Sequence, residues 1–179
     1  MIIDNDLVRQ AEEFGFSHAA LLDTSTLTLR VEARDMCAAG KCKSYNKSWV
    51  CPPACGTFEE IYGKLAGYSK GLIVQTTAYL EDNFDYEGMQ AAGALQKERF
   101  IRFRDALRER WPKLIALGSG SCRLCEACTW PDEPCRHSDE AIISMEAAGL
   151  IVSDVCKANN INYYYGPNTL TYSSCYILE

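Results

Sequence analysis

GLIVQTTAYL, residues 71–80, is an apolar run rich in β-branched side chains, which is typical of a central strand of a sheet. Upstream, TFEEIYGKLAGY predicts a helix that begins after Thr57, with Glu60 completing a capping box. Downstream, apolar residues at helical spacing predict a long helix over residues 87–111. Its apolar face would carry Phe100, Phe103, Leu107 and Trp111.

The rest of the chain continues this alternation of helices and strands. The expected elements are a helix over 5–14 that ends at Gly15, a strand over 18–23, a short strand within 114–120, a helix over 140–158 that breaks at Gly149, and a C-terminal β-hairpin over 161–178. We therefore expect a mixed α/β (α+β) fold: a single sheet with packed helices and two cysteine-rich loops at one edge. The length of 179 residues indicates one domain, residues 1–179.

CRLCEACTWPDEPC, residues 122–135, contains four of the ten cysteines in a C-x2-C-x2-C-x6-C pattern. This spacing approximates that of bacterial iron–sulfur proteins, with a longer final gap and with Pro134 before the last cysteine instead of after it. A short loop of this kind can surround a metal centre with thiolates. The four candidate ligands are Cys122, Cys125, Cys128 and Cys135.

A second set of cysteines stands upstream in CAAGKCKSYNKSWVCPPACG. Pro52 and Pro53 stiffen the chain beside these thiols, and Gly40 and Gly56 allow a close backbone approach. The candidate ligands are Cys37, Cys42, Cys51 and Cys55. How the eight cysteines group into centres is left open, because the two loops could cross over.

Three interpretations of these cysteines compete. Structural disulfides are disfavoured because the opening MIIDNDLVRQ contains no secretory signal, and this also predicts a cytoplasmic location. Structural zinc is an alternative, but zinc ribbons pair two C-x2-C knuckles across a gap. We favour iron–sulfur clusters, two [4Fe–4S] in number. Cys156 and Cys175 stand in a helical and a strand-like run, where lone cysteines are commonly buried hydrophobic residues.

Composition and charge exclude several functions. The net charge of −6 argues against general nucleic-acid binding, and no apolar run is long enough to span a bilayer. Phosphate loops, nucleophile elbows and HExxH motifs are missing from the sequence. His137, Glu126 and Asp132 flank the second cysteine loop but are expected to be supporting or solvated groups. A cluster of four tyrosines near the C-terminus, Tyr163, Tyr164, Tyr165 and Tyr172, is expected to pack in the core and the hairpin.

The segment from Lys97 to Lys113, which covers the second half of the predicted long helix and the two residues after it, is strongly basic although the chain as a whole is acidic. Its cationic residues are Lys97, Arg99, Arg102, Arg104, Arg108, Arg110 and Lys113. A solvated face with i,i+4 ion pairs is the simpler interpretation, and a docking surface for an acidic redox partner is the sharper one.

Three sequence features together resemble the predicted metal-binding family called domain of unknown function 2284. They are CPP at 51–53, CRLCEAC followed by PCRH at 122–137, and SMEAAGL at 144–150. Members are small cysteine-rich proteins found largely in anaerobic bacteria and archaea. The resemblance implies that the eight clustered cysteines are the metal ligands.

We therefore expect an iron–sulfur protein of an anaerobe that transfers electrons to a redox partner protein. The alternatives are a zinc-stabilised interaction module and a cluster-dependent reductase or activator enzyme. Electron transfer ranks first because it needs no group beyond the clusters.

Overall fold

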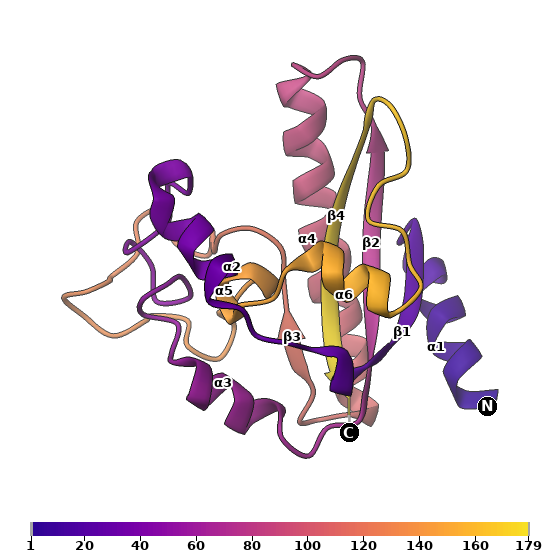
Figure 1. Ribbon diagram of the computed structural model, residues 1–179, viewed down its shortest axis with the longest axis horizontal. Helices are drawn as coiled ribbons and strands as arrows, with labels where there is room; N and C mark the ends of the chain where they lie inside the picture. The colour runs from indigo at the N-terminus through magenta and orange to yellow at the C-terminus, as the bar shows by residue number, and fades with distance from the viewer. Residues whose placement is uncertain (1, 179) are drawn as a thin grey trace.

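The computed structural model describes residues 2–178, in which four antiparallel strands form one sheet in the order β1-β2-β4-β3 (Figure 1). The strands are β1 (His18–Asp23), β2 (Lys70–Tyr79), β3 (Ile115–Leu117) and β4 (Thr169–Leu178). β2 pairs with β1 on one side and with β4 along its whole length on the other, and β3 pairs with β4. The expected mixed α+β fold and the inner position of β2 are thus confirmed.

Two helices, α1 (Ile2–Glu13) and α4 (Tyr86–Arg110), cover one face of the sheet. Side chains of a strand alternate between faces, and Leu72, Val74 and Tyr176 point to this side and pack against α4. The Tyr176 ring stacks on Phe100 at 4.5 Å, and its hydroxyl donates to the Phe100 carbonyl at 2.8 Å. The predicted apolar face of α4 therefore forms the centre of this core layer.

The opposite face is covered by shorter helices. They are α3 (Phe58–Leu65), α5 (Met145–Ala148) and α6 (Val152–Ala158), and Figure 1 shows α6 in front of the sheet with α4 behind it. Ile73 and Ile177, the alternate residues of β2 and β4, pack in this layer. The remaining elements are the 3-10 helix η1 (Thr24–Thr26), α2 (Val31–Met36) and the π-helical turn η2 (Cys37–Lys41).

The capping box at the start of α3 is confirmed. The Thr57 hydroxyl accepts from the Glu60 backbone N–H at 3.2 Å, and the Glu60 carboxylate accepts from the Thr57 N–H at 2.7 Å. These paired bonds satisfy two backbone donors at the N-terminus of α3, the helix that follows the first cysteine loop.

The helix expected over 140–158, with a break at Gly149, forms as two short helices, α5 and α6, on either side of that glycine, but residues 140–144 are not helical. Gly149 ends α5 with φ of +98°, and a Cβ there would lie 2.5 Å from the Phe58 ring. Before α5 the chain is extended, because Gly118 bonds to both Ile143 and Met145 across an isolated bridge. Gly118, just after β3, thus bonds to the backbone groups of Ile143 and Met145 that a longer α5 would use within the helix.

At the C-terminus, only the second arm of the expected hairpin forms a strand, which is β4. Residues 161–168 are irregular. Tyr165 in this segment stacks on His18 at 3.9 Å and donates to Gln75 Oε1 at 2.7 Å. Tyr163 and Tyr164 are exposed and do not pack in the core, contrary to expectation.

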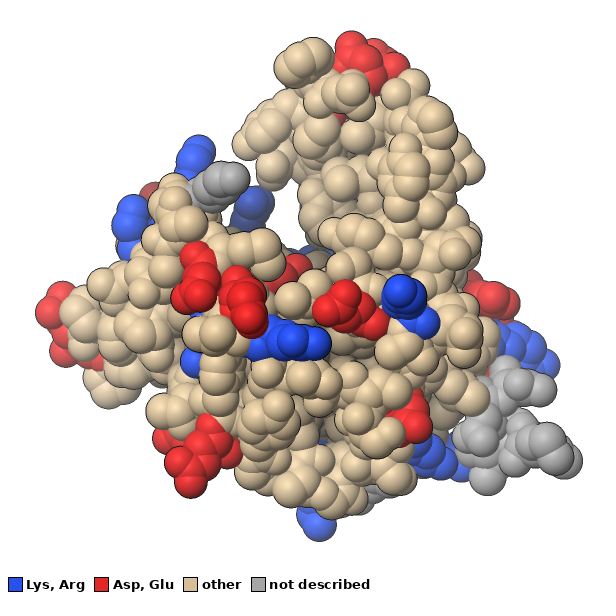
Figure 2. Space-filling view, in the orientation of Figure 1, with Lys and Arg blue, Asp and Glu red and all other residues tan. Residues whose placement is uncertain are grey.

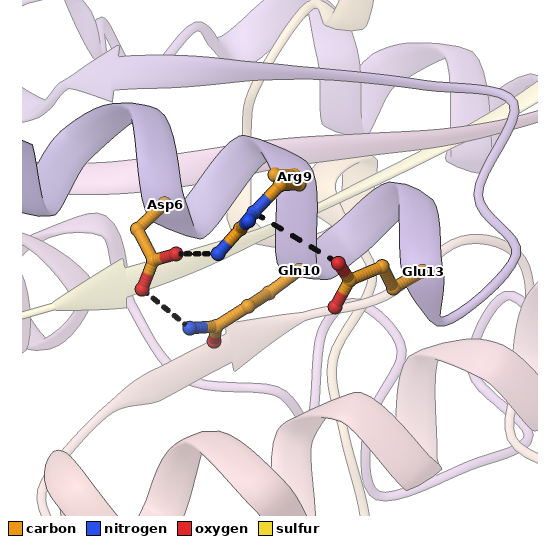
Figure 3. A network of polar contacts seen from close by, with 4 residues as sticks. All are labelled: Asp6, Arg9, Gln10 and Glu13. Carbon is orange, nitrogen blue, oxygen red and sulfur yellow. Dashed lines mark hydrogen bonds and ion pairs between the residues drawn. The ribbon is translucent and has the colours of Figure 1, made fainter.

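The outer surface of α1 is a network of polar side chains (Figure 3). Asp6 accepts from Arg9 at 2.6 Å and from Gln10 at 2.8 Å, and Arg9 also pairs with Glu13 at 3.8 Å. Exposed pairs of this kind contribute little to stability. Within the described part of the chain, none of the helices combines the length and the hydropathy that a bilayer span requires.

Candidate metal centre

Both cysteine loops lie beyond β3, at one edge of the sheet, as Figure 1 shows. The first loop begins where α2 runs directly into η2, so that Cys37 is at once the cap of α2 and the first residue of the π-helical turn. Gly40 takes φ of +80°, which redirects the chain into Cys42. A tight turn in which the Cys55 N–H bonds to the Cys51 carbonyl at 3.2 Å completes the set.

The first set of thiols surrounds a cavity. Cys37, Cys42 and Cys51 line a space of about 340 Å³ whose far wall includes Ser121 and Glu146. Cys55 is buried beside it, and its thiol donates to the Ala147 carbonyl of α5 at 3.4 Å. The structure therefore brings together the four cysteines of the first loop.

These thiols are electrostatically linked. Burial, followed by the charge of Cys42, raises the pKa of Cys51 to about 11. Burial and then Cys42 also raise the pKa of Cys37, and burial raises the pKa of Cys55 against the effect of Arg34. A bound cation would reverse this repulsion and stabilise the thiolates, so the set is suited to a metal.

Arg34 of α2 holds the first set in place. Its guanidinium donates to the Ala147 carbonyl at 2.9 Å, to the Gly56 carbonyl at 2.8 Å and to the Cys55 sulfur at 3.5 Å. It also lies 4.4 Å from the Phe58 ring centroid. Sequence reasoning missed this residue; its position one helical turn before Cys37 was the available signal.

The second set surrounds a neighbouring cavity of about 190 Å³. All four of its cysteines line this space, with Cys128 the exposed one. Two bonds close the loop: the Thr129 hydroxyl donates to the Pro134 carbonyl at 2.9 Å, and Arg136 donates to the Ala127 carbonyl at 3.2 Å. The opposite wall is Ser48, Trp49 and Val50 of the first loop.

Two tryptophans, which we call the tryptophan clasp, join the loops. The Trp49 indole N–H donates to the Glu133 carbonyl at 3.0 Å, and the Trp130 indole N–H donates to Asn46 Oδ1 at 3.2 Å. Their rings meet edge to face at 4.7 Å. Neither residue was identified from the sequence, although each stands two positions from a cysteine.

Residues of the first loop hydrogen-bond to the thiol of Cys128 in the second loop. Burial raises the pKa of Cys128, but hydrogen bonds from the backbone of Trp130 and Trp49 and from the Ser48 hydroxyl outweigh it and lower that pKa. Donors of this kind to a sulfur stabilise its thiolate. The two sets are thus parts of one polar assembly.

The other candidates have simpler environments. Glu126 and His137 line the second cavity, whereas Asp132 is exposed outside its lining. Cys156 and Cys175 are fully buried away from both loops, Cys156 against Gln75 at 3.6 Å and Cys175 in the core, as expected of buried hydrophobic residues.

The basic face of α4 is largely engaged within the molecule. Arg104 is buried and pairs with Asp105 at 2.7 Å, Arg99 donates to the Thr76 hydroxyl at 3.2 Å, and Arg102 pairs with Glu98 at 3.6 Å. On the opposite face of the molecule, shown in Figure 2, acidic and basic side chains are interspersed. The exposed Arg102–Glu98 pair is of the expected i,i+4 kind, whereas Arg104 is buried and not solvated. These contacts within the molecule argue against α4 as a docking surface.

An all-thiol donor set fits soft metals and iron–sulfur clusters. Among the side chains that the structure describes, no three Cys, His, Asp or Glu residues converge as the ligands of a single metal ion would. Tetrahedral zinc at 2.3 Å would hold its sulfurs roughly 3.8 Å apart. Seven of the eight cysteines line the two cavities, and Cys55 is buried beside the first.

Comparison with known proteins gives one match. The model of a family described as predicted metal-binding protein, DUF2284, matches residues 20–178. Searches of curated proteins and of solved structures find no match. The matched range includes both cysteine loops and every strand except the first two residues of β1. The chain therefore belongs to the DUF2284 family of predicted metal-binding proteins.

Proposed function

We propose that this protein is a cytoplasmic iron–sulfur protein that transfers electrons through two [4Fe–4S] clusters. One cluster would be held by Cys37, Cys42, Cys51 and Cys55, and the other by Cys122, Cys125, Cys128 and Cys135. When bound, such clusters supply one-electron redox chemistry. The observation that carries the proposal is the pair of adjacent thiol-lined cavities joined by the tryptophan clasp.

The surrounding residues support this assignment by what they do to sulfur. Arg34 donates to Cys55, and the backbone of Trp49 and the hydroxyl of Ser48 hydrogen-bond to Cys128. Hydrogen bonds to cluster sulfurs are one of the means by which a protein sets the reduction potential. The ten cysteines are all free, which suits a reducing compartment.

Electron transfer also requires a partner that reaches a cluster. Cys42 and Cys128 are the exposed members of the two sets. Lys43, Lys47 and Arg136 line the second cavity near them, so a redox partner protein with an acidic surface would dock there rather than on α4. Such an encounter would be weak and sensitive to salt.

The test is metal and sulfide analysis with visible absorption on protein purified without oxygen. We expect a brown protein with about four iron and four sulfide for each cysteine set. Cys125→Ser should lose the iron of one set. Cys156→Ser is the matched control, because Cys156 is a buried free cysteine outside both sets, and it should keep all the iron. A colourless protein with stoichiometric zinc would replace the proposal with a zinc-stabilised interaction module.

A further inference from the structure

A third groove, distinct from the two thiol-lined cavities, lies between the first half of α4 and residues 119–123. Its volume is about 400 Å³, within the range of small-molecule sites. Met89, Ala94 and Ile101 of α4 give it an apolar wall, and Tyr172 of β4 also lines it. The groove therefore has both the size and the surface for an organic molecule.

The charged residues of this groove favour an anion. Lys97 and Arg123 line it, and so does Glu98, whose carboxylate pairs with Arg102 at 3.6 Å. Among the described side chains, those of residues 6–40 and 42–178, no carboxylate lies in an ion pair with Lys97 or Arg123. Arg123 makes a long contact of 3.5 Å to the Gln90 amide oxygen. Two cations without carboxylate partners in one groove would attract an oxyanion, which Arg can bind in a bidentate manner.

The opposite wall supplies small polar groups. It is Ser119, Gly120 and Ser121, with Gly120 at φ of +69°. The same three residues and Lys97 also line a narrow recess of about 50 Å³ that reaches Cys122, and Gly120 and Ser121 line the cavity of the first cysteine set. Residues 120 and 121 thus separate a molecule in this groove from the cavity of the first set. The same molecule would lie close to Cys122 of the second set.

We propose that this groove binds a small organic anion, with its carboxylate or phosphate held by Lys97 and Arg123 and its apolar part against α4. The serine hydroxyls and the Gly120 backbone complete the polar wall. This site goes beyond electron transfer between proteins, because it gives the chain a small-molecule ligand beside its cysteines.

The binding test uses isothermal titration calorimetry on the full chain purified without oxygen, with phenyl phosphate and benzoate as probes and benzyl alcohol as their neutral counterpart. We expect saturable binding of at least one anion and none of the alcohol. Lys97→Met and Arg123→Gln should each weaken binding about tenfold or more, as loss of a charged hydrogen bond does.

Two further variants locate the site. Ala94→Phe keeps both cations but fills the groove from an exposed helix position, so it should abolish binding. Arg108→Gln removes an exposed α4 cation that pairs with Asp105, outside the groove, and should leave binding unchanged. Absence of saturable heat with both anions, equal binding of benzyl alcohol, or equal weakening by Arg108→Gln would overturn the proposal. Iron content is measured on the same samples and tests the clusters separately. The variants are compared at equal iron content, because Ser121 and Arg123 of the groove belong to the segment that carries the second cysteine set.

Discussion

The sheet and the cysteine assembly are stabilised in opposite ways. β2 and β4 pair along ten residues each, and their side chains are buried in two apolar layers. In contrast, no residue of the range 121–141 is buried, and the described side chains of the first loop add only Val50, Pro52 and two cysteines to the apolar interior. The sheet therefore forms from apolar burial, whereas the assembly depends on hydrogen bonds and on what its thiols bind.

The largest expected effect comes from removing the metal. Structural metal sites in small domains supply about 10–16 kcal/mol of folding free energy, so the loops should lose their order without it. Hydrogen exchange after chelation without oxygen should show rapid exchange over 37–56 and 121–141, with β2 and β4 still protected. Loop amides that stay protected in metal-free protein would remove the contrast between the two regions.

The next largest effect concerns the sheet. Phe103→Ala should lower the free energy of unfolding by about 3–5 kcal/mol, because Phe103 packs against Phe14, Phe16 and Tyr176 in the α4 layer. Urea denaturation measures this change. Phe84→Ala is the control, since Phe84 is 89% exposed and its loss should have almost no effect. Similar destabilisation by both changes would show that the apolar layer does not dominate stability.

The smallest expected effect comes from weakening the tryptophan clasp, which joins the two cysteine loops. Trp130→Phe keeps an aromatic ring beside Trp49 but removes the hydrogen bond to Asn46, so it should cost about 0.5–1.5 kcal/mol. We expect faster amide hydrogen exchange in both loops and unchanged amide exchange in β2. Trp111→Phe, at the end of α4, is the matched control and should leave the loops unaffected. Faster exchange confined to one loop would mean that the tryptophan clasp does not join them.

The accuracy of the sequence predictions follows the same division. β2, α4 and the capping box of α3 could be predicted because periodicity and local hydrogen bonds specify them. The helix expected over 140–158 was wrong in its first part, because Gly118 pairs with Ile143 and Met145 from a distant segment. Residues 161–166 likewise leave the strand conformation for contacts with His18 and Gln75.

For the site, the spacing of the cysteines predicted two sets, and the structure brings the members of each together. That these eight cysteines are the ligands, and that the ligand is an iron–sulfur cluster, stay predictions. Arg34 and the two tryptophans stand close to cysteines in the sequence, but their hydrogen bonds reach carbonyls more than twenty residues away, so their roles could not be predicted. Contacts at this separation leave no periodic signal along the chain.

The strand order has a consequence for synthesis on the ribosome. β3 pairs with β4 and with no other strand of the described chain, and β4 comes after the other three strands in the sequence. The segment that leads from β3 into Cys122 therefore has no anchor in the sheet until residues 169–178 have emerged. Non-local pairing of this kind is slow to form, so the second set of thiols would stay open to cofactor-delivering proteins during and after elongation.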